Sequence, residues 1–225
     1  MRSLHNLAIV AGLAVFALLL SGCNGGFGGT ITGSGNVKTE SRNVSGFQAV
    51  SLSGVGNLTI DENGTESLTV EAEDNLLPYI QTEVQGNRLV IGSKDNTNLN
   101  PTKPINYRLT VKDLNSIDLS GAGKIDGTGI NTPKLAVNVS GAGNMTLAGK
   151  ADSQEINLSG AGNYRAENLV SKNVKVSTSG AGSAVVQVSD TLDATVSGAG
   201  AVRYIGDPQV KQNVSGAGSV SKQNK

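Results

Sequence analysis

The chain of 225 residues balances 18 basic against 18 acidic residues and is 37% hydrophobic, which argues against a disordered polyelectrolyte and gives no electrostatic footprint for nucleic acid. Its 30 glycines are nearly twice the average usage of about 7%, whereas aromatic residues make up only 3%. The only histidine and the only cysteine, His5 and Cys23, lie close to the N-terminus. We therefore expect a folded, mainly β protein.

The N-terminal segment has the pattern of an export signal. Arg2 precedes an apolar and glycine run at residues 7–20, which is shorter than the roughly 20 residues that a membrane-spanning helix needs. The sequence LSGC at residues 20–23 resembles the bacterial lipobox, in which the chain is cut before a cysteine that then carries diacylglycerol. We predict a lipoprotein signal peptide at residues 1–22 and lipidation of Cys23, the alternative being an ordinary secretory signal.

Cleavage before Cys23 would remove His5 together with Arg2, the only charged residue in the signal, and leave a net formal charge of about −1. Attachment to a membrane would then depend on the lipid rather than on a basic surface. Asn24, directly after the cysteine, resembles the residue found in lipoproteins that are sorted to the outer membrane. The expected location is therefore the bacterial cell envelope.

Residues 23–44 are predicted to form the lipidated cysteine and a glycine-rich tether. Half of residues 24–35 are glycine, a composition typical of a flexible coil that would reach about 20 Å from the lipid. The folded domain is expected at residues 45–220, and the polar residues 221–225 are expected to form a tail.

Alternating apolar residues in the first part of the domain predict strands separated by turns. The polar stretch at residues 93–103, which contains Pro101, is expected to be a loop. The candidate strands are residues 46–52, 57–61, 67–72, 80–84, 88–91 and 105–111.

The tetrapeptide Ser-Gly-Ala-Gly then recurs at intervals of 18–20 residues. Apolar residues alternate on both sides of it, and counting by twos from Val139 passes through Gly141 and Gly143 to Met145. This parity predicts that both glycines face the interior and that the serine and the alanine face outward. The repeat serines are Ser120, Ser140, Ser159, Ser179, Ser197 and Ser215, and Ser53 begins an earlier variant of the motif.

Two short strands with their turns account for one repeat, so stacked repeats could bury a continuous core. A series of hairpins would need Asn-Gly or Asp-Gly turns at regular positions, and the folded domain has them only at residues 63–64 and 126–127. We predict an all-β fold, a right-handed parallel β-helix (β-solenoid) with coils of about 18–20 residues.

Three features resemble a known family of exported bacterial proteins. They are FQAVSLSGVGNLTI at residues 47–60, NRLVI at residues 87–91, and the series of Ser-Gly-Ala-Gly motifs. Together they are similar to the "putative auto-transporter adhesin, head GIN domain" family over about residues 45–220. The resemblance implies a β-helix-like fold and a role in adhesion, and it carries over no functional residue.

Familiar catalytic chemistry is excluded if the mature chain has no histidine and no free thiol, because Ser-His-Asp and Cys-His sites and the usual zinc sites need them. Carboxylates could still serve a carbohydrate-active enzyme, for which Asp118 with Asp126, or Asp152 with Glu155, are candidate pairs. Solvated or turn positions are the preferred interpretation of these residues. We expect neither a catalytic residue nor a cofactor.

An acidic segment at residues 61–74 contains six carboxylates and no lysine or arginine. Calcium is the ion that such oxygen ligands suit, although the spacing matches no EF-hand loop. Asp61, Glu62, Glu71 and Glu73 are weak candidates for a metal site, and a solvated edge strand is the preferred interpretation.

The repeat serines should align along one outer edge of the solenoid, with Asn144 and Asn163 close by. Stacked hydroxyls and amides could stabilise the solenoid by bonding to one another. They could instead present a polar lattice to a repetitive partner such as a glycan.

The leading hypothesis is a lipid-anchored, non-enzymatic envelope protein that presents a β-solenoid surface for binding or adhesion to a glycan or protein ligand. The alternatives are a carbohydrate-active β-helix enzyme that uses carboxylates, and a structural envelope protein.

Overall fold

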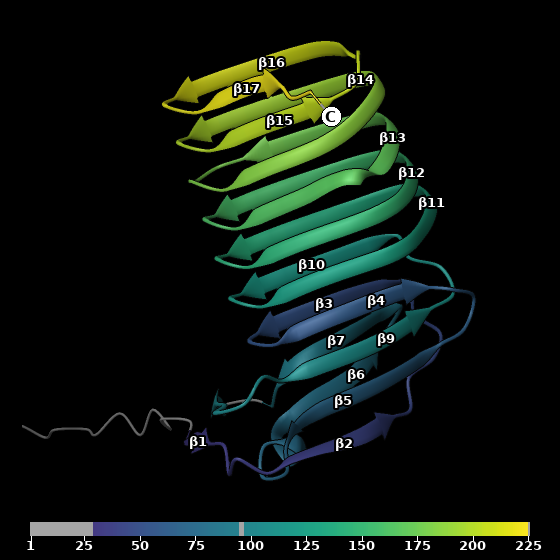
Figure 1. Cartoon of the computed structure of the whole chain (residues 1–225), viewed down its shortest axis with the longest axis vertical. Coiled ribbons are helices and arrows are strands. Elements are labelled where there is room, and N and C mark those ends of the chain that lie inside the picture. The colour runs from purple at the N-terminus through teal and green to yellow at the C-terminus, as the bar shows by residue number, and fades with distance from the viewer. Residues whose placement is uncertain (1–28, 95–96, 225) are drawn as a thin grey trace, which may run out of the picture.

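The repeats of 18–20 residues fold into the coils of a β-solenoid. The computed structural model describes residues 29–94 and 97–224 and is all-β, with about five turns of the solenoid stacked along its long axis (Figure 1). The predicted fold class is therefore confirmed. The predicted signal peptide and Cys23 lie outside the described residues.

The elements of the described residues comprise strands and one short 3-10 turn, η1. In the first half they are β1 (Thr30–Thr32), β2 (Val37–Arg42), β3 (Ala49–Gly54), β4 (Asn57–Glu62), β5 (Ser67–Glu73), η1 (Leu77–Tyr79), β6 (Ile80–Gln85), β7 (Arg88–Ser93), β8 (Asn98–Asn100) and β9 (Asn106–Val111). In the second half they are β10 (Ser116–Gly121), β11 (Lys124–Gly141), β12 (Asn144–Gly160), β13 (Asn163–Thr178), β14 (Ser183–Gly198), β15 (Ala201–Ile205), β16 (Gln209–Gly216) and β17 (Ser219–Lys222). All six candidate strands of the first half are present within a few residues of their predicted bounds.

Each coil has one sharp corner and one smooth arch. The corner is the Ser-Gly-Ala-Gly motif, and long strands such as β12 leave one corner, curve through the arch and return to the next corner, as the arches opposite the arrowheads show (Figure 1). We call the strand segments that lead into the corners the pre-corner sheet, and those that leave them the post-corner sheet. Neighbouring coils pair in parallel, so that Ser140 lies beside Ser120 on one coil and Ser159 on the next.

The two glycines of each corner have different roles, and the prediction that both face the interior is wrong for the first. Gly141 is exposed and has a φ of +110°, a left-handed conformation that bends the chain and that glycine adopts without strain. Gly143 is buried, and a Cβ there would lie 2.6 Å from Leu119 Cδ2 and 2.7 Å from the carbonyl oxygen of Gly123. The first glycine turns the chain, whereas the second lets neighbouring coils approach. Counting by twos could not separate these roles, because it assumes an unbroken strand through the corner.

The core between the two sheets is a continuous stack of aliphatic side chains, which is why alternation was readable in the sequence. It also contains three polar side chains that are hydrogen-bonded to one another, those of Tyr164, Gln154 and Ser171. The hydroxyl of the fully buried Tyr164 donates to Gln154 Oε1 at 2.6 Å, and Gln154 Nε2 donates to Ser171 Oγ at 2.6 Å. These bonds link two neighbouring coils, since Gln154 lies on β12 whereas Tyr164 and Ser171 lie on β13.

The N-terminal end of the solenoid is closed by a base of antiparallel pairs, in which β2 pairs with β5, β5 with β9, and β6 with β7. The base also includes residues that were predicted to be tether: β1 pairs with β8 inside the predicted loop at 93–103, and β2 spans residues 37–42. The prediction of a flexible tether is therefore wrong from residue 30 onward. A Cβ at Gly33 would overlap the carboxylate of Glu73, so this glycine serves a close contact rather than flexibility.

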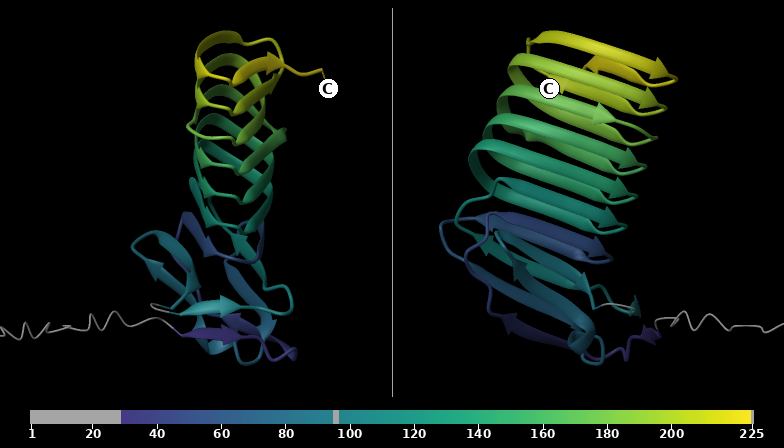
Figure 2. Two further views of the ribbon diagram at one scale, coloured as in Figure 1. Left: turned by 90° about the vertical axis from the view of Figure 1, so that its left-hand side faces the viewer. Right: turned by 180° about the vertical axis from the view of Figure 1, so that it is seen from behind.

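The last coil, formed by β16 and β17, lies at the opposite end from the base (Figure 2). Every residue of β16 is exposed, including Val210 at 39% and Val214 at 40%. Because β17 includes Ser221 and Lys222, the predicted tail at 221–225 begins inside a strand. In the part of the chain that the structure describes, no helix is long and apolar enough to cross a membrane.

Candidate functional site

The outer surface of the pre-corner sheet consists of columns of equivalent residues, because the parallel register repeats from coil to coil. The serine column lies at the corner edge, where Ser53 pairs with Ser120 and Ser197 pairs with Ser215. The hydroxyl of Ser197 donates to the Thr178 carbonyl at 3.2 Å, and that of Ser53 donates to the Ile91 carbonyl at 3.3 Å. In these two cases the serine binds the backbone of the adjacent strand rather than another serine.

An amide column lies next to the serines. Asn157 Nδ2 donates to Asn138 Oδ1 at 3.0 Å, and Asn138 Nδ2 donates to Asp118 Oδ1 at 2.6 Å. Asp118 also forms an ion pair with Arg88. This column is thus directional and ends on a carboxylate, which accepts the last amide proton and is neutralised by a cation.

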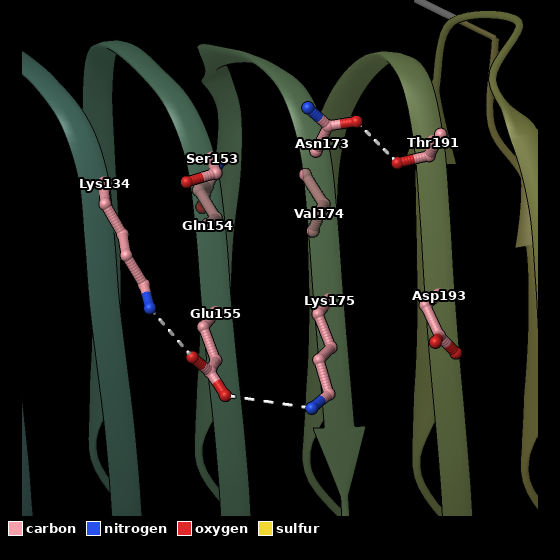
Figure 3. Close-up of a pocket in the computed structure, with 9 residues that line it drawn as sticks. All are labelled: Lys134, Ser153, Gln154, Glu155, Asn173, Val174, Lys175, Thr191 and Asp193. Carbon is pink, nitrogen blue, oxygen red and sulfur yellow. Dashed lines mark hydrogen bonds and ion pairs between the residues drawn. The ribbon is translucent and has the colours of Figure 1, made fainter.

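A column of alternating charge lies near the arch of the same sheet. Glu155 lies between Lys134, at 3.4 Å, and Lys175, at 3.8 Å, as the dashed lines in Figure 3 show. Lys211 and Asp193 continue the pattern at 3.6 Å. These pairs surround a shallow depression of about 320 Å³. Since each exposed pair contributes roughly 0–1 kcal/mol, the column defines a charge pattern more than it stabilises the fold.

The two candidate catalytic pairs are not arranged as acid pairs. Asp118 points outward from the pre-corner sheet and Asp126 from the post-corner sheet, where it forms an ion pair with Lys124 at 2.6 Å. Asp152 and Glu155 lie close in sequence, but Asp152 pairs with Lys172 at 3.1 Å and Glu155 with the two lysines of the charged column. Each carboxylate is engaged by a cation.

The acidic segment does not gather its oxygens around one point. Asp61 accepts from Asn63, Glu62 from the Asn131 backbone, and Glu71 from Asn106, each through a separate contact. In residues 29–94 and 97–224, no three carboxylate, histidine or cysteine side chains are placed to hold a metal ion.

Glu73, the remaining metal candidate, is fully buried in the base. Its carboxylate accepts hydrogen bonds from the Thr102 hydroxyl at 2.5 Å, the Thr102 backbone at 2.8 Å and the Gly35 backbone at 2.6 Å. These bonds, the Thr102 hydroxyl foremost, hold the pKa of Glu73 below its ordinary value despite burial. Glu73 therefore joins the N-terminal segment to the loop after β8, a role that the acidic composition did not indicate.

The post-corner sheet carries a cluster of which sequence reasoning named only Asn144 and Asn163. Lys124, Asn144, Thr146, Asn163 and Arg165 line a depression of about 250 Å³. Arg165 lies in the same column as Arg203, two coils further on. Aligning the repeats on their corners could have revealed this pair, because both arginines stand two residues after the start of a post-corner strand.

The corners, the stacked coils and the polar columns define a β-solenoid repeat protein whose two faces are lined by repeating polar side chains. The chain belongs to the family described as "Putative auto-transporter adhesin, head GIN domain", which matches residues 46–208. The resemblance seen in the sequence is confirmed. A comparison with curated proteins gave no match.

Solved structures share this fold over nearly the whole described chain. A putative adhesin from Bacteroides fragilis is 25% identical with a TM-score of 0.69, covering 87% of this chain and 100% of that one. A putative adhesin from Parabacteroides merdae is 20% identical with a TM-score of 0.56, and the match covers 86% of this chain and 99% of that one. A putative lipid binding protein from Parabacteroides distasonis is 21% identical with a TM-score of 0.58, and the match covers 87% of this chain and 100% of that one.

Proposed function

We propose that this protein is a lipid-anchored, non-enzymatic component of the bacterial cell envelope, held at the outer membrane through Cys23, that presents its solenoid faces for adhesion to a glycan. The family and two of the three solved structures described above carry adhesin names, which supports a surface or envelope role. The observation that carries the proposal is the array of outward hydrogen-bonding groups that repeats at each coil, about every 4.8 Å.

A repeating array suits a repeating ligand, because one contact with a sugar unit recurs at the next coil and many weak contacts add together. The amide and serine columns offer both donors and acceptors at the surface, as sugar hydroxyls require. The charged column adds positive and negative side chains to the groups that a ligand could contact.

The polarity of the molecule supports anchoring at one end. The first described residues lie at the base, and the last coil lies at the far end of the long axis (Figure 2). A lipid attached a few residues before the base would leave both faces accessible beside the membrane.

The enzyme alternative has less support from the geometry. Each carboxylate of the candidate pairs is engaged by a lysine or arginine. A glycosidase needs two carboxyl groups that flank one scissile bond, whereas these carboxylates are held by separate lysines and an arginine.

The anchor is tested by changing Cys23 to serine in the full-length protein expressed in a bacterial host. We expect labelled fatty acid to be incorporated into the parent protein alone, and only the parent to fractionate with membranes. Equal labelling of the Cys23→Ser protein would refute lipidation at this residue.

The binding activity is tested with the detergent-solubilised full-length protein immobilised and exposed to a panel of polysaccharides. We expect retention of polysaccharide without release of shorter products. Product release that is abolished by Asp118→Asn or Glu155→Gln would overturn the non-enzymatic proposal.

A further inference from the structure

We propose that the depression on the post-corner sheet is a binding site for the carboxylate or sulfate groups of an acidic polysaccharide. This inference rests on the proposed binding function and names its ligand class. The first support comes from the amide column whose asparagines line the depression, because its hydrogen bonds all run in one direction.

That column runs toward a cation. Ser183 Oγ donates to Asn163 Oδ1 at 2.6 Å, and Asn163 Nδ2 donates to Asn144 Oδ1 at 2.9 Å. The next residue in register is Lys124, whose ammonium group is itself a donor. Asn144 Nδ2 is therefore left without an acceptor among the described residues.

The amide column on the opposite sheet shows the contrast. There the last amide, on Asn138, donates to the carboxylate of Asp118. The pre-corner run of hydrogen bonds is thus complete within the protein, whereas the post-corner run stops at a free donor, Asn144 Nδ2, where the next residue in register is the cation Lys124. An oxyanion bound at this end would take the place that Asp118 takes on the other sheet.

Two cations complete the site. Lys124 uses one donor on Asp126 and remains 54% exposed, which leaves further N–H groups for a ligand. Arg165 forms no ion pair with any described residue, and its planar guanidinium can bind a carboxylate or sulfate through two parallel hydrogen bonds. Three donor groups of different strands therefore converge on one depression, and none of the residues that line it is a carboxylate.

Two carboxylates lie near the site, and neither forms an ion pair with Arg165. Asp126 lies in the same column as Arg165, two coils away with Thr146 between them, and it is held by Lys124. Glu167 lies two residues after Arg165 on β13, and its Oε2 is buried without a hydrogen-bond partner. The site therefore keeps the unpaired charge of Arg165.

The column arrangement favours a linear polymer over a membrane surface. Arg203 repeats the position of Arg165 two coils further on, about 10 Å away, with Val185 between them. Cations spaced along the solenoid axis suit anionic groups spaced along a chain that runs parallel to this axis. The flank of the solenoid also lies away from the base, where the anchor is expected.

The test measures binding of polygalacturonate, dextran sulfate and uncharged dextran to the immobilised, detergent-solubilised full-length protein, with phosphatidylglycerol vesicles as a separate arm. We expect binding of the two acidic polymers, weakening as salt rises, and little binding of dextran or vesicles. Arg165→Gln should reduce affinity for the acidic polymers roughly tenfold, the equivalent of about 1.4 kcal/mol.

Asn144→Asp is the sharpest variant. The new carboxylate still accepts the bond from Asn163, so the fold is retained, but it replaces the free donor with a negative charge. We expect at least the same tenfold loss of affinity with unchanged thermal stability. Lys172→Gln, which removes an exposed cation that pairs with Asp152 outside the depression and the charged column, is the matched control and should bind as the parent does.

Several results would overturn the site. They are unchanged binding by the Arg165→Gln and Asn144→Asp proteins, an equal loss in the Lys172→Gln protein, or binding of vesicles in place of the polymers. Binding of neutral dextran alone would overturn the acidic ligand and leave the proposed binding function standing. Failure to bind any polysaccharide would overturn both proposals.

Discussion

The corner glycines provide the most direct test of how the sequence specifies the coil. Gly162 is buried, and a Cβ at this position would lie 2.7 Å from the carbonyl oxygen of Gly143 and 2.7 Å from Val139 Cγ1. That carbonyl accepts a backbone hydrogen bond from Asn163 at 3.0 Å, so it cannot move away without weakening the pairing of two coils. Gly162→Ala should therefore force a local separation of the coils.

The magnitude is set by two opposing effects. Overpacking by one methyl group costs about 1–3 kcal/mol, whereas replacing glycine by alanine lowers the entropy of the unfolded chain and recovers about 0.4–1 kcal/mol. We expect a net loss of about 1–2 kcal/mol, or about 2–8 °C in Tm for a chain of this size. Ser159→Ala, at the exposed first position of the same corner, should change the free energy of unfolding by no more than about 0.5 kcal/mol.

The assay is urea and thermal unfolding of each variant, followed by circular dichroism and by tyrosine fluorescence. Both signals are needed because the coils of a solenoid can unfold separately. Equal destabilisation by Gly162→Ala and Ser159→Ala would refute the assignment of the second glycine to the close contact between coils.

Three further predictions concern the core, the base and the surface. Tyr164→Phe should destabilise the protein by about 1–3 kcal/mol in the same assay, because it leaves Gln154 Oε1 buried without its donor; no change would refute a structural role for this bond. Glu73→Gln should destabilise the protein at pH 7, and because the folded-state pKa of Glu73 lies below its ordinary value of 4.5, the difference from the parent should persist above about pH 4.5 and shrink as pH falls below it. Urea unfolding of both proteins across pH checks this prediction. A difference in the free energy of unfolding that grows as pH falls would contradict it. Lys175→Met should change the free energy of unfolding by less than about 1 kcal/mol, and a larger loss would show that the charged column stabilises the fold.

The sequence predicted the coil because its two strongest signals are local. The corner tetrapeptide recurs, and inward residues such as Val137, Val139 and Met145 alternate beside it, since each coil repeats the same burial. The base was less readable. Its strands pair antiparallel across long separations, as β2 does with β5, and no repeat marks these partners.

Two of the errors have a common physical origin in how glycine was interpreted. Glycine at positions 33 and 35 suggested flexibility, but both lie beside the buried Glu73, where a side chain at Gly33 would overlap the carboxylate and Gly35 has a φ of +84°. Gly141 suggested an inward position, but its left-handed conformation turns the chain. Composition records how often glycine occurs, whereas its role depends on contacts that only the folded chain supplies.

The candidate site was predicted only in part, because hydrogen-bond direction cannot be read from residue identity. The sequence placed Asn144 and Asn163 near the repeat edge and left open whether such residues stabilise the fold or bind a ligand. The two amide columns differ in the residue that comes next in register at the end of each column, Asp118 on one sheet and Lys124 on the other. Asp118 lies one coil before Asn138, and Lys124 lies one coil before Asn144, so neither is a neighbour of its asparagine in the sequence.

The parallel stacking of coils has a mechanical consequence for a protein held at one end. Each coil is bonded only to the coils before and after it, so a pull on the far end along the long axis loads the layers of hydrogen bonds in series. The outermost coil, β16 with β17, has a neighbour on one side only and should detach first. Each detached coil of about 19 residues would release about 60 Å of extended chain. In the proposed role of an anchored adhesin, the protein would thus yield to shear through a sequence of small extensions instead of a single rupture.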